Sequence, residues 1–257
     1  MNAMNGMNAV LPLAIGLVAV LYASVGHAGA TGYIAVMTLL GLAPVVIRPT
    51  ALVLNVIVAT IATVQFFRAG HFRSGLFWPL AAASVPCAAI GGAIDLPTGA
   101  FEALVGVVLL LSAIQILRDG IRRHRAGGQE HEPAPTQNFT PIVLSALGGA
   151  IGLLSGLTGV GGGVFLTPAL LALRSAPVKQ IAAITAPFIL LNSLAGLAGG
   201  LFAGRPLPPI SLPVIAAAAL GGAIGSQLGA FRLPVRTLRF LMAAVLAFAS
   251  VKLLGMI

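Results

Sequence analysis

Charged residues are scarce in this chain. Only 7% of its 257 residues are Asp, Glu, Lys or Arg, whereas 58% are hydrophobic. A soluble globular domain carries roughly 25% charged residues, so this chain has too few of them to cover a surface that faces water. The composition therefore excludes a soluble enzyme, a secreted disulfide scaffold and a disordered tail. It predicts an all-α polytopic membrane protein.

Cysteines and acidic residues are nearly absent. Cys87 is the only cysteine, which excludes an internal disulfide and a cysteine-based metal cluster. Of the five acidic residues, Asp95 and Glu102 lie at the ends of apolar segments, and the others lie in or beside the polar stretch 119–140. Carboxylates buried in a bundle usually mark a membrane site for a cation, so their scarcity disfavours a metal or amine substrate. We expect no metal and no cofactor.

A positively charged N-terminal region is also missing, because no Lys or Arg precedes Arg48. A secretory signal peptide begins with such a region. We therefore expect the apolar run at residues 9–21 to belong to the mature membrane domain.

Long apolar runs dominate what is present. A spanning helix needs about 20 apolar residues. Two runs, 9–43 and 142–173, are longer than that, and each is apolar at both ends and glycine-rich in the middle. The stretch 119–140 is polar and is the only substantial linker in the sequence. Six further segments have the expected spanning length, namely 50–68, 75–94, 99–118, 180–203, 210–230 and 236–255.

The two halves of the chain resemble each other. A duplicated unit of four hydrophobic segments is the simplest explanation. We predict a first membrane repeat at 1–118, a cytoplasmic linker at 119–140 and a second membrane repeat at 141–257. The matching residues are Gly26, Gly29 and Pro44 with Gly159, Gly162 and Pro177 at an offset of 133, and Leu96-Pro97 with Leu233-Pro234 at an offset of 137.

The distribution of Lys and Arg distinguishes two topologies. If the runs 9–43 and 142–173 each cross the membrane once, the 14 cations divide six against eight and give no orientation. If each run enters and leaves on the same side, Arg48, Arg205 and Lys252 share one side and the other eleven cations share the opposite side. The second division fits the positive-inside rule, so the net charge of +9 is better explained by topology than by nucleic-acid binding.

This second topology makes the first segment of each repeat a glycine-broken re-entrant hairpin or a pair of short spans. It also inverts the two repeats relative to each other, an arrangement typical of transporters. It places the linker 119–140 in the cytoplasm and both termini outside, in a multi-pass protein of the inner cell membrane.

The glycine-rich centres, 26–32 and 156–163, predict helix breaks. Irregular backbone at membrane depth persists only where protein buries it or where it lines a wet cavity. Two breaks that enter from opposite faces should meet near the midplane, with helices starting near 31–42 and 163–173. Unpaired N–H groups at a helix start suit an anion, and each start contributes about 0.3–2 kcal/mol. The alternative role for glycine, helix packing, fits Gly221, Gly222 and Gly225 best.

Polar residues in and near the breaks are the candidate binding groups. The hydroxyls, including Ser155, either donate to an anion or bond back to a helix carbonyl. The buried amides are interhelical clamps or ligands, and His27 titrates near neutral pH, binds the anion or makes an interhelical hydrogen bond. The full set for substrate binding is Ser24, Gly26, His27, Gly29, Thr31, Asn55, Thr158, Gly161, Gly162, Gly163, Thr185 and Asn192.

The second break, residues 156–168, resembles the signature of the TauE/SafE family of sulfite and organosulfonate exporters, also grouped with toluene-sulfonate uptake permeases. The pattern is a GxGGG run followed by proline, and the resemblance extends over essentially the whole chain. In the first repeat, Ala28 and Ala30 replace two of the glycines. The resemblance implies a sulfur-containing anion such as sulfite or a small sulfonate, whereas the residues alone indicate only a small anion.

We therefore expect an alternating-access exporter of such an anion. A cytoplasm-negative potential favours anion exit by about 2.3 kcal/mol per charge per 100 mV. A channel-like conduit or an uptake pathway for another small anion remains the alternative. An intramembrane enzyme with Ser24 as nucleophile and His27 as base is disfavoured, because Gly26 and Gly29 break the helix and no acid orients the histidine. The expected partners are the anion and the lipid bilayer, not nucleic acid, and assembly with further copies of the chain is left open.

Overall fold

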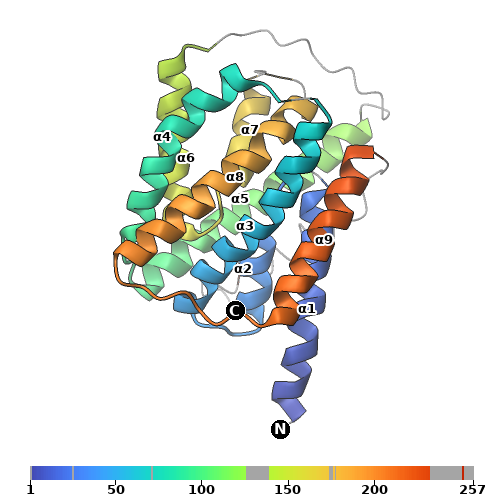
Figure 1. Ribbon diagram of the computed structural model, residues 1–257, viewed down its shortest axis with the longest axis vertical. Helices are drawn as coiled ribbons and strands as arrows, with labels where there is room; N and C mark the ends of the chain where they lie inside the picture. Colours follow the sequence, from blue (N-terminus) through green and yellow to red (C-terminus); the bar gives the residue numbers. More distant parts are fainter. Residues whose placement is uncertain are drawn as a thin grey trace.

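The computed structural model describes residues 2–24, 26–70, 72–125, 139–173, 176, 178–231 and 251. Within these ranges the chain is a bundle of nine helices with no strand (Figure 1). The helices are α1 (Asn2–Ala23), α2 (Ala30–Leu39), α3 (Pro44–Arg68), α4 (Ser74–Ala93), α5 (Thr98–Arg125), α6 (Pro141–Thr158), α7 (Gly163–Ala172), α8 (Val178–Phe202) and α9 (Leu212–Phe231).

Four of these helices are long and apolar enough to cross a membrane, namely α3, α4, α6 and the Gln180–Phe202 part of α8. Shorter apolar stretches lie in α1, α2, α5 and α9. The predicted segments 50–68, 75–94, 99–118, 180–203 and 210–230 fall on α3, α4, α5, α8 and α9 in turn. The predicted segment 236–255 lies outside the described residues except for Val251. This composition and architecture are those of an all-helical multi-pass membrane protein.

Helix α3 starts six residues before the apolar segment predicted from the sequence. Pro44 occupies the first turn, where its missing N–H and fixed φ are tolerated. Pro49 follows inside the helix. Arg48, which lies between the predicted apolar segments 9–43 and 50–68, is therefore a helical residue, and its side chain is buried.

Both predicted breaks are present as interruptions of helix. The first lies between Ala23 and Ala30, and the second between Thr158 and Gly163. The backbone at Gly161 (φ +79°) and Gly162 (φ +83°) is left-handed. Only glycine adopts that conformation without a steric penalty. The break is therefore fixed by the glycines and not by packing alone.

The two broken segments approach the middle of the bundle from opposite ends. Figure 1 shows that α1 runs inward from the end where α3 begins and that α2 returns to this end. α6 runs inward from the opposite end, and α7 returns there. We call the first the Arg48 end, because it carries Arg48 and Arg205. We call the second the Arg68 end, because it carries Arg68 and Arg73.

Each broken segment packs along a helix from the other half of the chain. α6 runs parallel to α4, and α1 runs parallel to α9. Glycines make both contacts close, because a Cβ on these glycines would overlap the backbone of the facing helix. The facing positions are Gly148 with Leu80, Gly152 with Ser84 and Gly156 with Ala88 between α6 and α4, and Gly221 with Gly16 and Gly225 with Val20 between α9 and α1. The packing role expected for Gly221, Gly222 and Gly225 is confirmed, with Gly222 against Val58 of α3.

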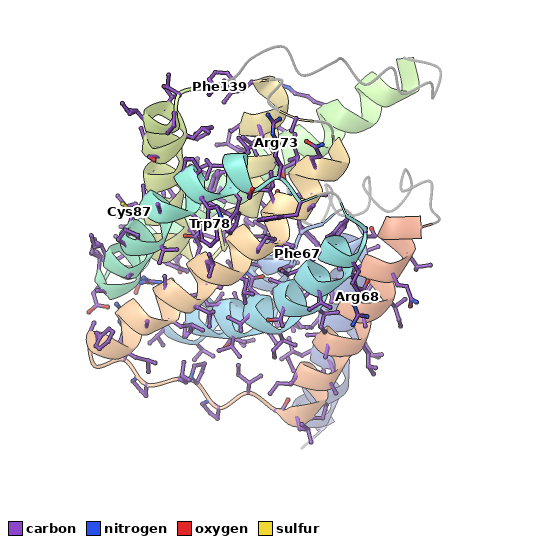
Figure 2. All side chains as sticks on the ribbon, turned by 45° about the horizontal axis from the view of Figure 1, so that its top comes forward. Phe67, Arg68, Arg73, Trp78, Cys87 and Phe139 are labelled. Atoms are coloured by element: carbon purple, nitrogen blue, oxygen red, sulfur yellow. The ribbon has the colours of Figure 1, made fainter. Side chains whose placement is uncertain are left out.

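An aromatic cluster lies where α3 turns into α4 at the Arg68 end. Phe67 stacks on Phe72 with ring centroids 4.3 Å apart, and Phe77 contacts Phe72 and Trp78 at 5.2 Å each. Arg68 and Arg73 lie beside these rings (Figure 2). Exposed aromatic rings and arginines at a helix end are typical of the region where a protein meets lipid headgroups.

Candidate anion site at the helix breaks

The two breaks meet at His27. The imidazole Nε2 of His27, from the first break, lies 3.2 Å from the carbonyl oxygen of Gly163, the first residue of α7. The same nitrogen lies 3.2 Å from the hydroxyl of Thr167, one turn further along α7. Residues separated by about 140 positions in the sequence thus share one polar contact between the broken segments.

The hydrogen-bond chain at this contact has a defined direction. Thr167 Oγ1 lies 3.2 Å from Thr185 Oγ1 on α8, and Thr185 donates its single hydroxyl proton to the carbonyl of Ile181 at 2.8 Å. Thr185 must then accept from Thr167, and Thr167 must accept from His27. A carbonyl such as Gly163 O can only accept, so the same assignment places the imidazole proton on Nε2. These hydrogen bonds link α7 and α8 to the first break.

The second break presents backbone amides beside these hydrogen bonds. Gly161, Gly162 and Gly163 are all buried, and their N–H groups make no hydrogen bond to another described residue. The hydroxyl of Ser155 is also buried, and it has no hydrogen-bond partner within the described ranges. Its Cβ lies 3.5 Å from the position that a Cβ on Gly162 would occupy. Unpaired donors at a helix start, in a region of low dielectric, are the arrangement by which proteins bind anions without a metal.

The two buried asparagines take different positions. Asn55 Nδ2 on α3 lies 3.4 Å from Val160 O in the second break and 3.4 Å from Ser193 Oγ on α8. Asn192 Oδ1 accepts a 2.7 Å hydrogen bond from Ser84 on α4. Both therefore act as interhelical clamps. Each also keeps one buried amide atom that no residue in the described part of the chain contacts by a hydrogen bond, Oδ1 in Asn55 and Nδ2 in Asn192. Of the two, only Asn55 contacts a break.

Several of the predicted hydroxyl donors are already used within the protein. Ser24 donates to Leu21 O at 2.7 Å, and Thr158 donates to Leu154 O at 2.7 Å, which is the back-bonding alternative. Thr31 donates to the Tyr22 hydroxyl at 2.9 Å, inside the first hairpin. The predicted residues that the structure brings together are thus His27, Thr185, Asn55 and the glycines 161–163. Ser24, Thr31 and Asn192 bond elsewhere, whereas the Thr158 hydroxyl also accepts from Val160 N–H in the second break at 3.3 Å.

The glycines at the junction leave no room for side chains. A Cβ on Gly26 would lie 2.8 Å from Ala182 Cβ on α8, and one on Gly29 would lie 2.8 Å from the Tyr33 ring. A Cβ on Gly163 would overlap Ile189 Cδ1 and lie 2.8 Å from Ile189 Cγ1. Contacts this short do not occur between real atoms, so the breaks are held closely against α8 and α2.

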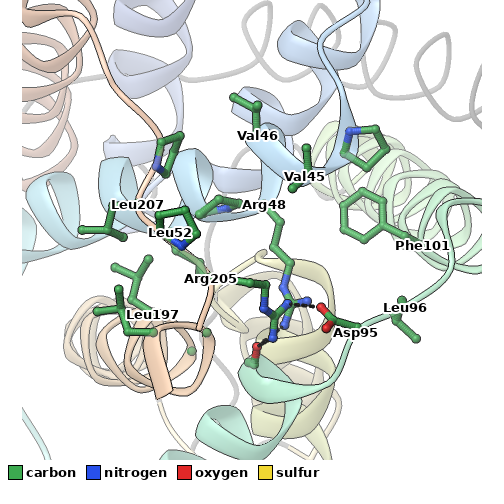
Figure 3. A pocket seen from close by; sticks show the side chains of 18 of the residues that line it. Val45, Val46, Arg48, Leu52, Asp95, Leu96, Phe101, Leu197, Arg205 and Leu207 are labelled. Atoms are coloured by element: carbon green, nitrogen blue, oxygen red, sulfur yellow. Dashed lines mark hydrogen bonds and ion pairs between the residues drawn. The ribbon is translucent and has the colours of Figure 1, made fainter. Parts of the chain in front are cut away.

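Sequence reasoning missed a charged cluster at the Arg48 end. Arg48 donates to Gly91 O at 2.6 Å, Gly92 O at 2.9 Å and Ile94 O at 3.1 Å, which are carbonyls at the C-terminus of α4. Arg205 donates to Gly92 O and Ile94 O as well, and pairs with Asp95 at 3.0 Å. Both guanidiniums line a cavity of about 360 Å³ (Figure 3).

Arg48 lies between this cavity and the second break. A Cβ on Gly159 would lie 3.0 Å from Arg48 Cγ, so the arginine stem packs directly on the break. The sequence held one signal for the cluster: the in-and-out topology places Arg48 and Arg205 on one side, away from most other cations. In the positive-inside division every cation counts as a marker of a loop. That division therefore gives no sign that Arg48 is buried, that Arg205 is half-buried and that the two side chains face each other. Thr167 lies within the glycine-rich motif at residues 156–168 but is not among the site residues predicted from the sequence.

No group of three His, Cys, Asp or Glu side chains that would suit a metal ion is found among the residues that the structure describes. The polar groups at the breaks are amides, hydroxyls and one imidazole, which suit an anion better than a divalent cation.

Comparisons with known proteins agree with this picture. The family model described as "Sulfite exporter TauE/SafE" matches residues 11–253. A relative from Sinorhizobium fredii (strain NBRC 101917 / NGR234), named "Probable membrane transporter protein y4hK", is 38% identical over 246 residues, which cover 95% of this chain and 97% of the relative. No solved structure matches the chain.

Proposed function

The chain belongs to the TauE/SafE family and is a membrane transporter, and from this premise we propose that it exports a small sulfur-containing anion, sulfite or an organosulfonate. The anion binds between the two glycine-rich breaks and leaves by alternating access. A transporter, not an enzyme, is what both the family and the relative indicate.

The observation that carries the proposal is the contact between the two breaks. His27 of the first break bonds to the start of α7. The amides of Gly161, Gly162 and Gly163 are buried there and pair with none of the residues that the structure describes. Three amides and the Ser155 hydroxyl offer donors to an oxyanion. Because no carboxylate is among these groups, an anion meets no repulsion there.

The arrangement of the two broken segments supports alternating access. The broken segments come from opposite ends of the bundle, and each packs along a helix of the other half: α1 on α9, and α6 on α4. We propose that α1–α5 and the chain from α6 onward are two inverted copies. In such transporters one set of helices moves against the other around a central site.

The charged ends support an orientation. Exposed Arg68 and Arg73, with the aromatic cluster, suit the cytoplasmic headgroup region of the inner cell membrane. The Arg48 end then faces outside, with both termini on that side and the linker 119–140 in the cytoplasm. A cytoplasm-negative potential drives an anion toward the Arg48 end by about 2.3 kcal/mol per charge per 100 mV.

Flux into and out of reconstituted vesicles tests this function. Vesicles containing the purified chain are loaded in turn with sulfite, sulfoacetate, taurine, sulfate and chloride, and efflux is measured at a set potential. We expect saturable efflux of sulfite or sulfoacetate that increases as the inside is made more negative. Flux of chloride without any sulfur anion would contradict the proposal.

The same vesicles distinguish the alternative, a channel-like or uptake pathway. An alternating-access carrier exchanges labelled for unlabelled anion faster than it performs net efflux, because the loaded site returns readily. A flux that rises linearly with concentration and shows no exchange would instead indicate a conduit.

A further inference from the structure

The charged cluster at the Arg48 end carries more positive charge than capping of α4 requires. The last carbonyls of a helix hold a partial negative charge that one cation can satisfy. Here Arg48 and Arg205 both donate to Gly92 O and to Ile94 O, so two like charges lie side by side. Within the described part of the chain, only Asp95 pairs with either of them. One positive charge is left over.

The Arg205 guanidinium also keeps an unused donor. Its Nε is buried and has no hydrogen-bond partner among the described residues, although its two terminal nitrogens bond to Asp95 and to α4. A buried donor without an acceptor is costly, and the cost is greater for a charged group. Asp95, by contrast, is 79% exposed, so its hold on Arg205 is screened by water.

The cavity beside these groups is largely apolar. Its volume is about 360 Å³, which is within the range of protein pockets that bind small organic molecules. Apart from the two arginines, Asp95 and Thr98, its walls come from proline, glycine and aliphatic residues and one aromatic ring. The apolar side chains labelled in Figure 3 are Val45, Val46, Leu52, Leu96, Phe101, Leu197 and Leu207.

We propose that this cavity is a second anion-binding site, separate from the junction of the breaks, for a small organic oxyanion that carries an apolar group. The charged end of the anion binds the guanidiniums of Arg205 and Arg48, which together carry one positive charge more than Asp95 neutralises. The apolar part of the anion packs against Phe101 and the aliphatic wall. Asp95 competes for Arg205 from within the chain and is displaced when the anion binds. Because Arg48 packs on Gly159, the site adjoins the path from the second break.

Equilibrium binding to the purified full chain in a non-ionic detergent tests this site. The probe is benzenesulfonate, titrated by calorimetry and compared with sulfite. We expect benzenesulfonate to bind more tightly than sulfite. We expect Asp95→Asn to tighten benzenesulfonate binding about tenfold by removing the competitor, and Arg205→Gln to weaken it by a similar factor, with Arg205→Lys between the two.

The matched control is Glu102→Gln, which removes a carboxylate near the start of α5 that does not line the cavity. Its affinity for benzenesulfonate should match that of the unchanged chain. If the arginines only cap α4, Asp95→Asn will leave the affinity unchanged and Arg205→Gln will only lower the thermal unfolding temperature. That result would overturn the proposal.

Two further outcomes separate this site from related ideas. If phosphatidylglycerol in nanodiscs binds in an Arg205-dependent way and benzenesulfonate does not, the cavity holds a lipid headgroup and the proposal is wrong. If benzenesulfonate binds as expected but no sulfur anion is transported in vesicles, the proposed function fails while this site stands. If sulfur anions are transported but the Asp95 and Arg205 variants bind benzenesulfonate as the unchanged protein does, this site fails while the proposed function stands.

Discussion

Single residues at the second break combine an unusual backbone with a lack of space. Gly161 has a φ of +79°, and a Cβ there would overlap Asn55 Nδ2 and lie 2.9 Å from Ile189 Cγ2. Gly204 has nearly the same φ, +78°, but nothing lies within 4 Å of its Cβ position. The two glycines therefore separate the backbone cost of an alanine from its steric cost.

Replacing Gly161 with alanine should destabilise the protein more than replacing Gly204 with alanine. Both variants bear the left-handed penalty of about 1–2 kcal/mol, and Gly161→Ala adds an overpacking cost of about 1–3 kcal/mol. Thermal unfolding in detergent measures the difference, and vesicle flux should fall for Gly161→Ala alone. Equal unfolding temperatures would show that the break relaxes around a methyl group.

The hydroxyl of Thr167 is the middle member of the hydrogen-bond chain that links His27 to Thr185. Thr167→Val keeps the shape and removes two hydrogen bonds, each worth about 0.5–1.5 kcal/mol. We expect a lower unfolding temperature and reduced sulfur-anion flux. Thr60→Val is the control, because the exposed Thr60 hydroxyl bonds only to Val56 O of its own helix. If both variants behave alike, the hydrogen-bond chain through Thr167 has no role in transport.

The candidate site was predictable from sequence to the extent that glycine and histidine interrupt apolar runs. Three glycines in a row cannot continue a membrane helix, and His27 lies in the matching break, so their meeting followed from the pattern. The partners Thr167, Ser193 and Arg205 were not predictable in this way. Which helix face a hydroxyl or guanidinium occupies depends on pairings that a single sequence does not encode.

At the scale of helices, α6 approaches the backbone of α4 closely at some of its glycines and not at others. A Cβ on Gly152 would overlap Ser84 O, whereas one on Gly149 would lie 3.4 Å from Cys87 Sγ, an ordinary contact. The two glycines lie three residues apart in the same helix and both face α4, but only Gly152 is held against its backbone. They form a matched pair for testing the close approach of the helices.

Gly152→Ala should cost about 1–3 kcal/mol, because the added methyl group forces the two backbones apart. Gly149→Ala should be neutral or stabilise slightly, since alanine is the better helix former by roughly 1 kcal/mol. Thermal unfolding of the two variants in the same detergent gives the comparison. A Gly152→Ala protein as stable as the original would mean that the α4–α6 contact is looser than the structure shows.

Most helix positions followed from apolar runs, and their pairing did not. The predicted segments fall on α3, α4, α5, α8 and α9, because about 20 apolar residues define a span in any context. The start of α3 was misplaced by six residues, because proline and arginine read as a loop although both are tolerated in the first turns of a helix. Only the structure shows that α6 lies on α4 and α1 on α9.

For the whole molecule, the orientation of its two ends is testable with introduced cysteines. Gly70 and Gly204 lie in exposed turns at the Arg68 and Arg48 ends, share a left-handed backbone and have open space around them. In a Cys87→Ser background, we expect Gly204→Cys to react with a membrane-impermeant maleimide in intact cells. Gly70→Cys should react only after the membrane is permeabilised.

Labelling of both cysteines in intact cells, or of Gly70→Cys alone, would contradict the proposed orientation. A Cys87→Ser protein without introduced cysteine is the blank for this experiment, because Cys87 is the only native thiol.

The pairing of each broken segment with a helix of the other half has a consequence for how the protein is made. α1 is translated long before the helix against which it packs, because α9 starts only at Leu212. The first hairpin must therefore wait in the lipid, without its final neighbour, until most of the polypeptide has been translated. Neither half has a complete interior by itself, so synthesis of the N-terminal half alone should yield a product that quality-control proteases remove.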